Sequence, residues 1–472
     1  MKKPSILIIS YYFAPKNEVA AIRLTKLAKF LVRNGWKVSV LTFEGNPFNS
    51  YENKKDETLL SPELEEIEIE YVNLPKLWLK VISMKTMLKA RKINRNSSEE
   101  TLESPKGTKS GGSIKKKSAI KKQLFYMAYY AYDVFFNYLL TQGARKHIDK
   151  LIYNNNPDVI FSSFGPISSV NIGKYAKKQS KSSHWLLDLR DSIIRLSDYE
   201  VPPIYGIKKR FERKNLIKAD SVSVVSKGMK EGILDRHKDL KNEMIGKVQI
   251  FTNGYDLEDL NLVNDREKII EKDNNLHICY VGRLYPDRSR VQMLAEAIQE
   301  LTQERSIDLD RIKIHYAGSS FSIFKSQLVE YGISDILINH GVISRSQSLQ
   351  LQKECHLLLM LTWNDKHDKG IITGKLLEYM MTKRPILALV SGDVKNSEAK
   401  SIIESCRIGM AFEEATYHDD IKSLKKFIVD SFNQVSTKGD ILYNPNEEEL
   451  EAFNYEKITD RLTEHLINKK LM

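Results

Sequence analysis

Short apolar runs alternate with helical patterns along almost the whole chain, and this alternation restricts the fold more than any other feature. The runs have the length of buried strands, and the segments between them repeat apolar residues at helical spacing. Strands that alternate with helices build parallel sheets with crossover helices, so we expect an α/β fold. The expected strands are 6–9, 38–41, 159–162, 185–188, 221–225, 248–251, 278–281, 312–317, 357–361 and 386–390, and the expected helices are 20–33, 291–301, 323–331, 346–354 and 373–382.

The alternation occurs in two successive sets, which predicts two doubly wound, Rossmann-like domains with a cleft between them. A chain of 472 residues is also too long for one ordinary core. A strong turn signal, Thr252-Asn-Gly-Tyr-Asp256, lies near the boundary. We therefore expect an N-terminal domain over 1–258, a C-terminal domain over 259–445, and a helix within 446–472 that crosses back to the N-terminal domain.

The composition favours a globular cytoplasmic protein. Hydrophobic residues make up 42% of the chain, yet no apolar run approaches the length of a membrane-spanning helix. The N-terminus is expected to form a buried strand and not a signal peptide, because its apolar core is only 6–9. The three cysteines, Cys279, Cys355 and Cys406, are far apart and form no metal-binding motif, which fits a reducing compartment without structural zinc.

The net charge of +12 is concentrated in one segment. Residues 85–122 hold twelve lysines and arginines against three glutamates, which accounts for +9 of it. Within this segment, 94–118 has almost no large apolar residue, so we expect it to be a disordered basic insertion. Aromatic residues follow over 125–139. Basic residues beside aromatic ones are typical of a helix on a membrane surface, and a partly buried helix after a loose loop is an equal alternative.

The segment 370–389 carries the most functional information. A loop ends there, a helix opens near Thr373 to Lys375, and a buried strand follows Pro385. A helix N-terminus presents unpaired N–H groups and suits a phosphate. Glu378, about one turn into the helix, can accept hydrogen bonds from two hydroxyl groups. The pattern therefore suits a nucleotide sugar, and its plain alternative is an ordinary loop–helix–strand unit.

A second candidate site follows the strand 278–281. Gly282 lacks a side chain and permits close approach of a ligand, and Arg283 and Arg288 are spaced so that both can meet a diphosphate. Two solvated cations are the alternative. Gly318 ends the strand 312–317 in the same way, and Gly341 ends a further strand. For both, the alternative is a tight turn, which needs no ligand.

In the first half of the chain, polar and glycine residues also follow expected strands, where open α/β folds bind ligands. Asp188 and Asp191 come at the end of 185–188 in the sequence Asp-Leu-Arg-Asp, and Phe164-Gly165 follows 159–162. Arg23 lies in the helix after the first strand. The alternatives are a helix N-cap for Asp191, a plain turn for Phe164-Gly165 and a surface salt bridge for Arg23.

These segments together resemble family 4 glycosyltransferases, which are retaining enzymes of the GT-B fold, and in particular the bacterial cell-surface polysaccharide type. The resemblance is carried by Gly-Ile-x-x-x-Lys-Leu-x-Glu-Tyr from Gly370, by Val-Gly-Arg at 281–283 and by Asp-x-Arg-Asp at 188–191. It also includes Tyr-Phe-x-Pro followed by Ala-Ile-Arg, which here ends at Arg23. The matches run in family order from residue 6 to about 410.

The resemblance implies a role for each domain and for each candidate site residue. The C-terminal domain would bind a nucleoside diphosphate sugar, with the donor-binding residues Gly282, Arg283, Arg288, Gly318, Ile371, Ile372, Lys375 and Glu378. The N-terminal domain would bind a glycan or lipid-linked acceptor, with Arg23, Phe164 and Gly165 at the cleft. Asp191, and after it Asp188, would serve at the active centre. No metal and no cofactor would be required, and the enzyme would be a hexosyltransferase of polysaccharide biosynthesis.

The chain also departs from the family pattern. Residues 16–23 contain no glycine, no histidine lies between Asp188 and Asp191, and Gly370 stands where many members have a glutamate that grips the donor sugar. Backbone N–H groups of Ile371 and Ile372 would take over that function. Alternatives are a nucleotide-sugar epimerase or phosphorylase on the same fold, and a non-catalytic basic protein that binds a membrane surface or nucleic acid. The expected location is the cytoplasm, peripheral on the inner face of the plasma membrane, with no nucleic-acid partner.

Overall fold

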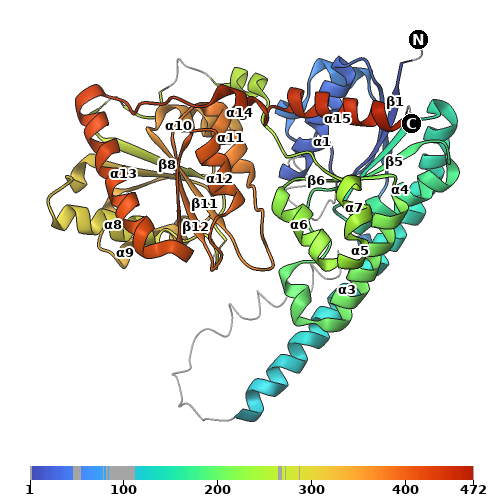
Figure 1. Ribbon diagram of the computed structural model, residues 1–472, viewed down its shortest axis with the longest axis horizontal. Helices are drawn as coiled ribbons and strands as arrows, with labels where there is room; N and C mark the ends of the chain where they lie inside the picture. The colour runs from blue at the N-terminus through green and yellow to red at the C-terminus, as the bar shows by residue number, and fades with distance from the viewer. Residues whose placement is uncertain are drawn as a thin grey trace. The chain divides into compact units, whose positions relative to one another are not determined.

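The structure, a computed structural model, describes residues 3–16, 18–45, 55–77, 79–80, 83, 112–263, 268–271, 273–285 and 287–470. The chain forms two compact units (Figure 1). Unit 1 comprises Met1–Val224, Arg236–Gln249 and Thr463–Met472, and unit 2 comprises Val225–Asp235 and Ile250–Leu462.

Unit 1 is built on a seven-stranded sheet in the order β3-β2-β1-β4-β5-β6-β7, counted over the described residues. The interior strand β1 pairs in parallel with β2 on one side and β4 on the other. Its residues are buried on both faces, as in parallel sheets covered by helices. The strands are β1 (Ser5–Ile9), β2 (Lys37–Phe43), β3 (Glu68–Val72), β4 (Val159–Ser163), β5 (His184–Leu189), β6 (Ser221–Val224) and β7 (Val248–Ile250).

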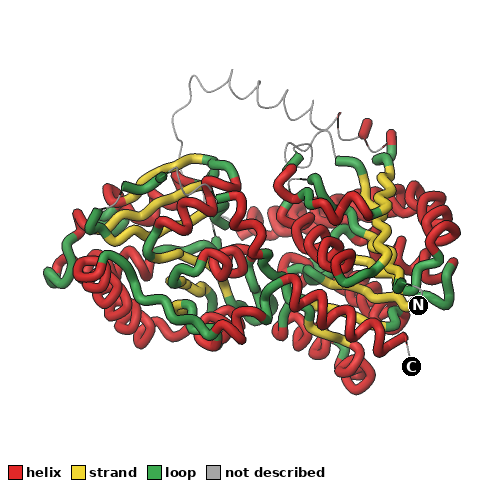
Figure 2. Tube along the Cα trace, turned by 90° about the horizontal axis from the view of Figure 1, so that it is seen from above, coloured by secondary structure: helices red, strands yellow, loops and turns green. Residues whose placement is uncertain are grey.

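Helices connect these strands as crossovers, and Figure 2 shows red helices on either side of the yellow strands. The helix α6 (Lys227–Arg236) lies almost wholly in unit 2, and the last helix, α15 (Tyr455–Lys470), begins in unit 2 and ends in unit 1. The other helices of unit 1 are α1 (Val19–Arg33), α3 (Gly112–Asn155), α4 (Ile167–Gln179), α5 (Pro202–Lys218) and α7 (Lys241–Lys247).

Unit 2 contains a parallel sheet of six strands, in the order β10-β9-β8-β11-β12-β13. Its strands are β8 (Leu276–Val281), β9 (Ile312–Ala317), β10 (Leu337–Gly341), β11 (Leu357–Trp363), β12 (Ile386–Ser391) and β13 (Gly409–Glu413). Its helices are α8 (Gln292–Gln303), α9 (Phe321–Val329), α10 (Arg345–Glu354), α11 (Gly374–Thr382), α12 (Glu398–Ser405), α13 (Tyr417–Lys438) and α14 (Glu447–Glu451).

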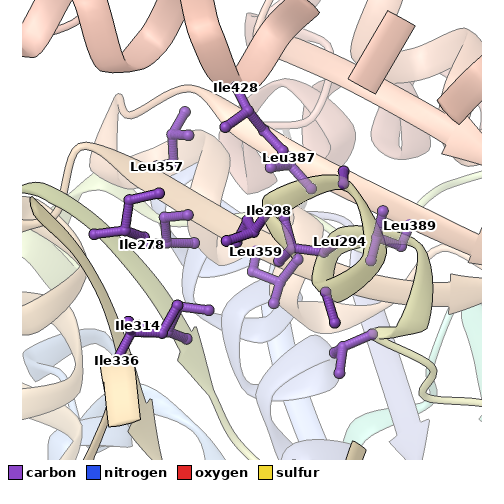
Figure 3. Close-up of a cluster of buried hydrophobic side chains, with 14 of the residues drawn as sticks. Ile278, Leu294, Ile298, Ile314, Ile336, Leu357, Leu359, Leu387, Leu389 and Ile428 are labelled. Carbon is purple, nitrogen blue, oxygen red and sulfur yellow. The ribbon is translucent and has the colours of Figure 1, made fainter. Parts of the chain in front are cut away.

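The sheet of unit 2 separates two apolar cores. One core joins the strands to α8, α9 and α13, and Figure 3 shows Leu294 and Ile298 of α8 and Ile428 of α13 among strand side chains. The other core joins the opposite face to α10, α11 and α12. Burial on both faces explains why these strands are continuous apolar runs in the sequence.

The structure confirms the predicted α/β fold class of two Rossmann-like, parallel-sheet domains. Each of the ten expected strands and five expected helices is present, with ends within about two residues, the usual scatter in helix and strand boundaries. The strand expected to end at Gly341 is β10, whereas β3 and β13 were not expected. Several helices, including α4, α5, α12 and α13, were also missed.

The basic insertion predicted over 94–118 overlaps the start of α3. The backbone is helical from Gly112, and residues 94–111 lie outside the described part of the chain. The aromatic stretch 125–139 is part of α3 as well. Within the described residues, none of the helices combines the length and the apolar character needed to cross a membrane.

Each sheet has a point at which the strand order reverses. In unit 1 it lies between β1 and β4, and in unit 2 between β8 and β11. In open α/β sheets, ligands bind beyond the carboxyl ends of the strands at such a point. The loops that follow β1, β4, β8 and β11 are therefore where a site is expected in each unit.

Candidate functional site

The carboxyl ends of β8, β9 and β10 form a surface of bare backbone in unit 2. The N–H of Gly282 donates to the carbonyl of Ala317 over 2.7 Å, and the N–H of Gly318 donates to the carbonyl of Gly341 over 2.7 Å. A Cβ on Gly318 would overlap the carbonyl of Gly282. Glycine is thus required at Gly318 by the close approach of the neighbouring strand end, and a ligand can reach the backbone here.

Lys375 reaches back from α11 to this surface. Thr373 caps the helix, and its hydroxyl accepts a hydrogen bond from the N–H of Leu376 over 3.4 Å. From the first turn, the ammonium of Lys375 lies 5.0 Å from the ring centroid of Tyr280, and a Cβ on Gly282 would lie only 3.2 Å from it. The predicted donor residues Gly282, Gly318 and Lys375 therefore lie together.

The ammonium of Lys375 has no carboxylate within 4.0 Å in the described part of unit 2. Burial lowers the pKa of this lysine, and the more distant charge of Glu378 only partly opposes the effect. A half-buried cation without a counter-ion is destabilised, and an anion placed over Gly282 would relieve this. The geometry therefore favours an anionic ligand at the β8 end.

Glu378 is held one turn further along α11. Its carboxylate accepts a hydrogen bond from the side-chain amide of Gln352, which also donates to Ser348 over 3.0 Å. Gln352 and Ser348 belong to α10. This hydrogen bond from a neighbouring helix holds the side chain of Glu378 in one orientation.

The two arginines after β8, Arg283 and Arg288, differ in their exposure and in their ion pairs. Arg283 is exposed, and in the described residues it has no ion pair, while its carbonyl accepts a hydrogen bond from the hydroxyl of Tyr280 over 3.0 Å. Arg288 is already paired: its guanidinium donates to Asp368 over 2.5 Å and lies 4.7 Å from the ring of Trp363. Arg283 can thus meet a ligand directly, whereas Arg288 must first leave Asp368.

In the loop after β11, Gly370 packs closely against Gly228. Gly370 has φ +72°, and a Cβ on it would lie 2.6 Å from the hydroxyl of Ser226 and 2.8 Å from the Cα of Gly228. Next to this contact, Glu398 accepts hydrogen bonds from the N–H groups of Lys227 and Gly228, each over 2.7 Å. The predicted residues Ile371 and Ile372 follow Gly370 directly, so the packing of Gly370 on Gly228 restricts the position of their backbone.

In unit 1, the structure brings Arg23 and Asp188 together. The guanidinium of Arg23 lies 2.9 Å from the carboxylate of Asp188, which is fully buried. The hydroxyls of Ser163 and Ser223 donate to the same carboxylate over 2.7 and 2.8 Å. These contacts join α1, β4, β5 and β6. The ion pair therefore stabilises the carboxyl ends of these strands, from which the loops extend.

Asp191 lies apart from that pair and is exposed. Its side chain is 73% accessible, and its nearest cation is Arg190 at 3.8 Å. Arg190 donates to the carbonyl groups of Phe164 over 2.9 Å and Ala20 over 2.6 Å, and the predicted residue Gly165 lies against it. The loops after β4 and β5 and the start of α1 are therefore held together by Arg190, beside an accessible carboxylate.

Sequence reasoning missed four residues of these sites, namely Arg190, Trp363, Asp368 and Glu398. Arg190 lies between the two predicted aspartates, which was the available signal, but the other three have no motif around them. Within the described ranges, three or more histidine, cysteine or acidic side chains do not gather anywhere in a metal-binding arrangement.

No family model and no curated protein matches the chain by sequence. Solved structures do match. Sucrose-phosphate synthase from Thermosynechococcus elongatus is 14% identical with a TM-score of 0.55, and the match covers 99% of each chain. The two-domain arrangement of strands and the match over the whole length decide the fold. The chain has the GT-B fold.

Two further GT-B structures match with similar scores. The lipopolysaccharide outer core galactosyltransferase WaaB is 14% identical, with a TM-score of 0.51 over 97% of this chain and 99% of WaaB. A mutant of TarM from S. aureus, in complex with fondaparinux, alpha-GlcNAc-glycerol and UDP, is 11% identical, with a TM-score of 0.52 over 98% and 99% of the two chains.

Proposed function

We propose that the protein is a retaining glycosyltransferase of the family 4 type. It would transfer a sugar from a nucleoside diphosphate donor to a glycan acceptor, which we propose is lipid-linked, without a metal ion. The enzyme would work in the cytoplasm, at the inner face of the plasma membrane. The observation that carries the proposal is the half-buried ammonium of Lys375 above Gly282, at the point where the strand order of unit 2 reverses.

A diphosphate fits this position for three reasons. The bare backbone at Gly282 and Gly318 allows close approach, Lys375 lacks a counter-ion in the described structure, and Arg283 offers a second, exposed cation. Arginine and lysine near a departing diphosphate stabilise the charge that develops on its oxygens. Glu378, fixed by Gln352, would accept hydrogen bonds from the ribose hydroxyls. The N–H groups of Ile371 and Ile372 would bind the sugar or the distal phosphate.

Unit 1 would bind the acceptor. Asp191 is the candidate catalytic residue, because its carboxylate is accessible and lies beside the loops that Arg190 holds. Asp188 would be a positioning residue, because its carboxylate is buried and bonded to Arg23. In the reaction, the bond between the sugar and the diphosphate breaks, the acceptor oxygen bonds to the sugar carbon, and the acceptor proton passes to a phosphate oxygen of the leaving group.

The test is calorimetric titration of the full chain with UDP and GDP. A charge-assisted hydrogen bond is worth about 1.5–3 kcal/mol, so Arg283→Ala and Glu378→Ala should each weaken binding of the preferred nucleotide about tenfold or more. The control is Lys325→Ala, which removes an exposed cation of α9 in the same unit. Unchanged affinity in both site variants would remove the donor-site assignment.

Mass spectrometry of products then identifies the reaction. The protein is incubated with a panel of nucleotide sugars and lipid-linked acceptors, and a product heavier by one sugar residue is expected for one donor. Conversion of a nucleotide sugar into an isomer, with no acceptor consumed, would show an epimerase instead.

A further inference from the structure

The N-terminal half of α3 has an apolar surface on the side where a surface helix is normally polar. From residue 123 to residue 136 none of the side chains is buried. The helix extends from the side of unit 1 in this region, where it is drawn in cyan in Figure 1. We define the α3 outer stripe as Leu124, Met127, Ala131, Val134, Phe135 and Tyr138, which are all exposed.

The spacing of the stripe shows that it is one continuous face. Its members follow one another at intervals of three and four residues, with Val134 and Phe135 adjacent, and such residues share one side of a helix. The exposed fractions include 62% for Leu124, 45% for Phe135 and 56% for Tyr138. Another side of the helix faces the interior from Asn137 onward, where the side chain of Asn137 accepts a hydrogen bond from the N–H of Ser168 over 2.7 Å.

The second half of the same helix is an internal comparison. There the outward positions that continue the stripe are Gln142, Arg145, Lys146 and Asp149, and the inward positions Ala144 and Ile148 are buried. This half has the usual polar outer face of a helix on a globular domain. The stripe therefore belongs to the part of α3 that ends at Tyr138, and exposed apolar surface of this kind marks an interaction site.

The positive charge of residues 112–132 indicates that the partner of the stripe is anionic. Residues 112–132 of α3 contain five lysines, at 115, 116, 117, 121 and 122, and no aspartate or glutamate. Phe125 and Tyr129, which are 68% and 58% exposed, lie in the same turns of α3 but on another side of the helix. Aromatic residues beside a cluster of lysines on one helix suit the interface of an anionic bilayer, where rings enter the headgroup region and lysines meet lipid phosphates.

We propose that the α3 outer stripe is a membrane-docking surface that lies in the interface of an anionic lipid bilayer. A second copy of the chain is a poorer partner, because each copy has five lysines and no aspartate or glutamate in 112–132, so pairing would bring together segments of like charge. The proposal does not rest on the transferase activity, since it uses no residue of the donor or acceptor sites.

The test is co-sedimentation of the full chain with vesicles of phosphatidylglycerol and phosphatidylcholine, and with vesicles of phosphatidylcholine alone. At low salt the protein should sediment with the anionic vesicles, and high salt should weaken this. The double variant Leu124→Ser/Phe135→Ser should lower the partition coefficient about tenfold or more. Its control is Tyr153→Ser, which removes an aromatic residue of the same helix that is 89% exposed but lies outside the stripe.

A second variant tests the charge. Lys115→Gln/Lys116→Gln/Lys117→Gln should reduce binding to anionic vesicles at low salt. Circular dichroism and UDP titration check that each variant is folded. The proposal is overturned if the wild-type chain does not bind anionic vesicles at low salt, or if Leu124→Ser/Phe135→Ser binds as wild type does. A dimer that Phe135→Ser dissociates, without vesicle binding, would show that the stripe is a self-association surface instead.

Discussion

The ion pair between Arg288 and Asp368 would set a cost on the proposed binding of a nucleotide donor. The guanidinium donates to Asp368 over 2.5 Å, and the indole N–H of Trp363 donates to the same carboxylate over 2.9 Å. If Arg288 meets the diphosphate, it must leave this carboxylate. Asp368→Asn keeps an acceptor for Trp363 but removes the charge, so it should tighten nucleotide binding about threefold to tenfold.

Calorimetric titration with UDP or GDP measures this effect. Asp365→Asn is the matched control, because Asp365 lies in the same loop but 3.9 Å from Arg288. Weaker nucleotide binding in Asp368→Asn would contradict the prediction and would show that Asp368 holds Arg288 in its working position.

A side chain at position 318 should destabilise unit 2. A Cβ there would overlap the carbonyl of Gly282, and because that atom is backbone it cannot turn aside. Gly318→Ala should lower the free energy of unfolding by about 1–3 kcal/mol, measured by chemical denaturation. Gly206→Ala in α5 is the control, because a Cβ at this helical glycine meets nothing within 4 Å and should stabilise by about 0.5–1 kcal/mol. Equal effects of the two substitutions would refute the packing argument.

The residues that sequence reasoning found are those next to strand ends. Gly282 and Lys375 could be placed together because a strand end and a helix start meet at one edge of a parallel sheet. Asp368 and Trp363 could not be found in this way, since their roles depend on how the loop after β11 folds back onto Arg288. The buried state of Asp188 was also unpredictable, because its partner Arg23 is 165 residues away in sequence.

At the scale of elements, the two missed strands, β3 and β13, lie at sheet edges, and the edge strand β10 was expected only from the glycine that ends it. β3 ends the sheet of unit 1, and β10 and β13 end the sheet of unit 2. An edge strand has fewer apolar neighbours, so its sequence need not be a continuous apolar run. The sequence of β3, Glu-Ile-Glu-Tyr-Val, has only one buried residue, whereas each residue of the interior strand β1 is buried. Periodicity therefore predicts interior strands better than edges.

A row of histidines crosses β8, β9 and β10 and makes unit 2 sensitive to acid. His315 lies 2.8 Å from His277 and 2.9 Å from His340, measured between ring nitrogens, and His277 lies 2.8 Å from the carboxylate of Asp273. With Asp273 as acceptor, His277 donates to it and accepts from His315, which accepts from His340. Neutral His315 satisfies both bonds. Burial, and then the neighbouring His277 and His340, lower the pKa of His315 to about 3.

This shift predicts a loss of stability in acid. The folded-state pKa of His315 lies below the ordinary value of 6.5, so between these two values the unfolded chain binds a proton that the folded chain does not. The stabilisation is complete above pH 6.5 and is lost as the pH falls toward 3, with a slope of about 1.4 kcal/mol per pH unit for one proton.

Urea denaturation of the wild type and of His315→Gln from pH 7 to pH 4 measures the slope. The variant should show a shallower loss of stability over this range. His418→Gln, which removes an exposed histidine of α13, should keep the wild-type slope. Identical slopes in wild type and His315→Gln would show that another group causes the acid sensitivity.

At the scale of the whole molecule, the fold class followed from the alternation of strands and helices, but the path of the chain between the units did not. The predicted boundary after residue 258 kept 225–235 in the first domain, whereas these residues cluster with unit 2. The physical reason is local: Gly228 packs on Gly370, and Glu398 bonds the N–H groups of Lys227 and Gly228. Neither contact has a signal in the local pattern of the sequence, because both depend on packing between distant segments.

The proposed reaction also makes a prediction about metal. A departing diphosphate needs positive charge, and in many enzymes a divalent ion provides it. Here the cations of Lys375 and Arg283 and the backbone N–H groups around Gly282 would provide it. Transfer of sugar, once a donor is identified, should therefore keep nearly its full rate in EDTA, measured by product formation. Lys375→Ala should slow the same reaction about a hundredfold, because it removes a half-buried cation from the developing charge. Complete loss of turnover in EDTA, restored by magnesium or manganese, would contradict the proposed chemistry while leaving the nucleotide-binding assignment to be judged by calorimetry alone.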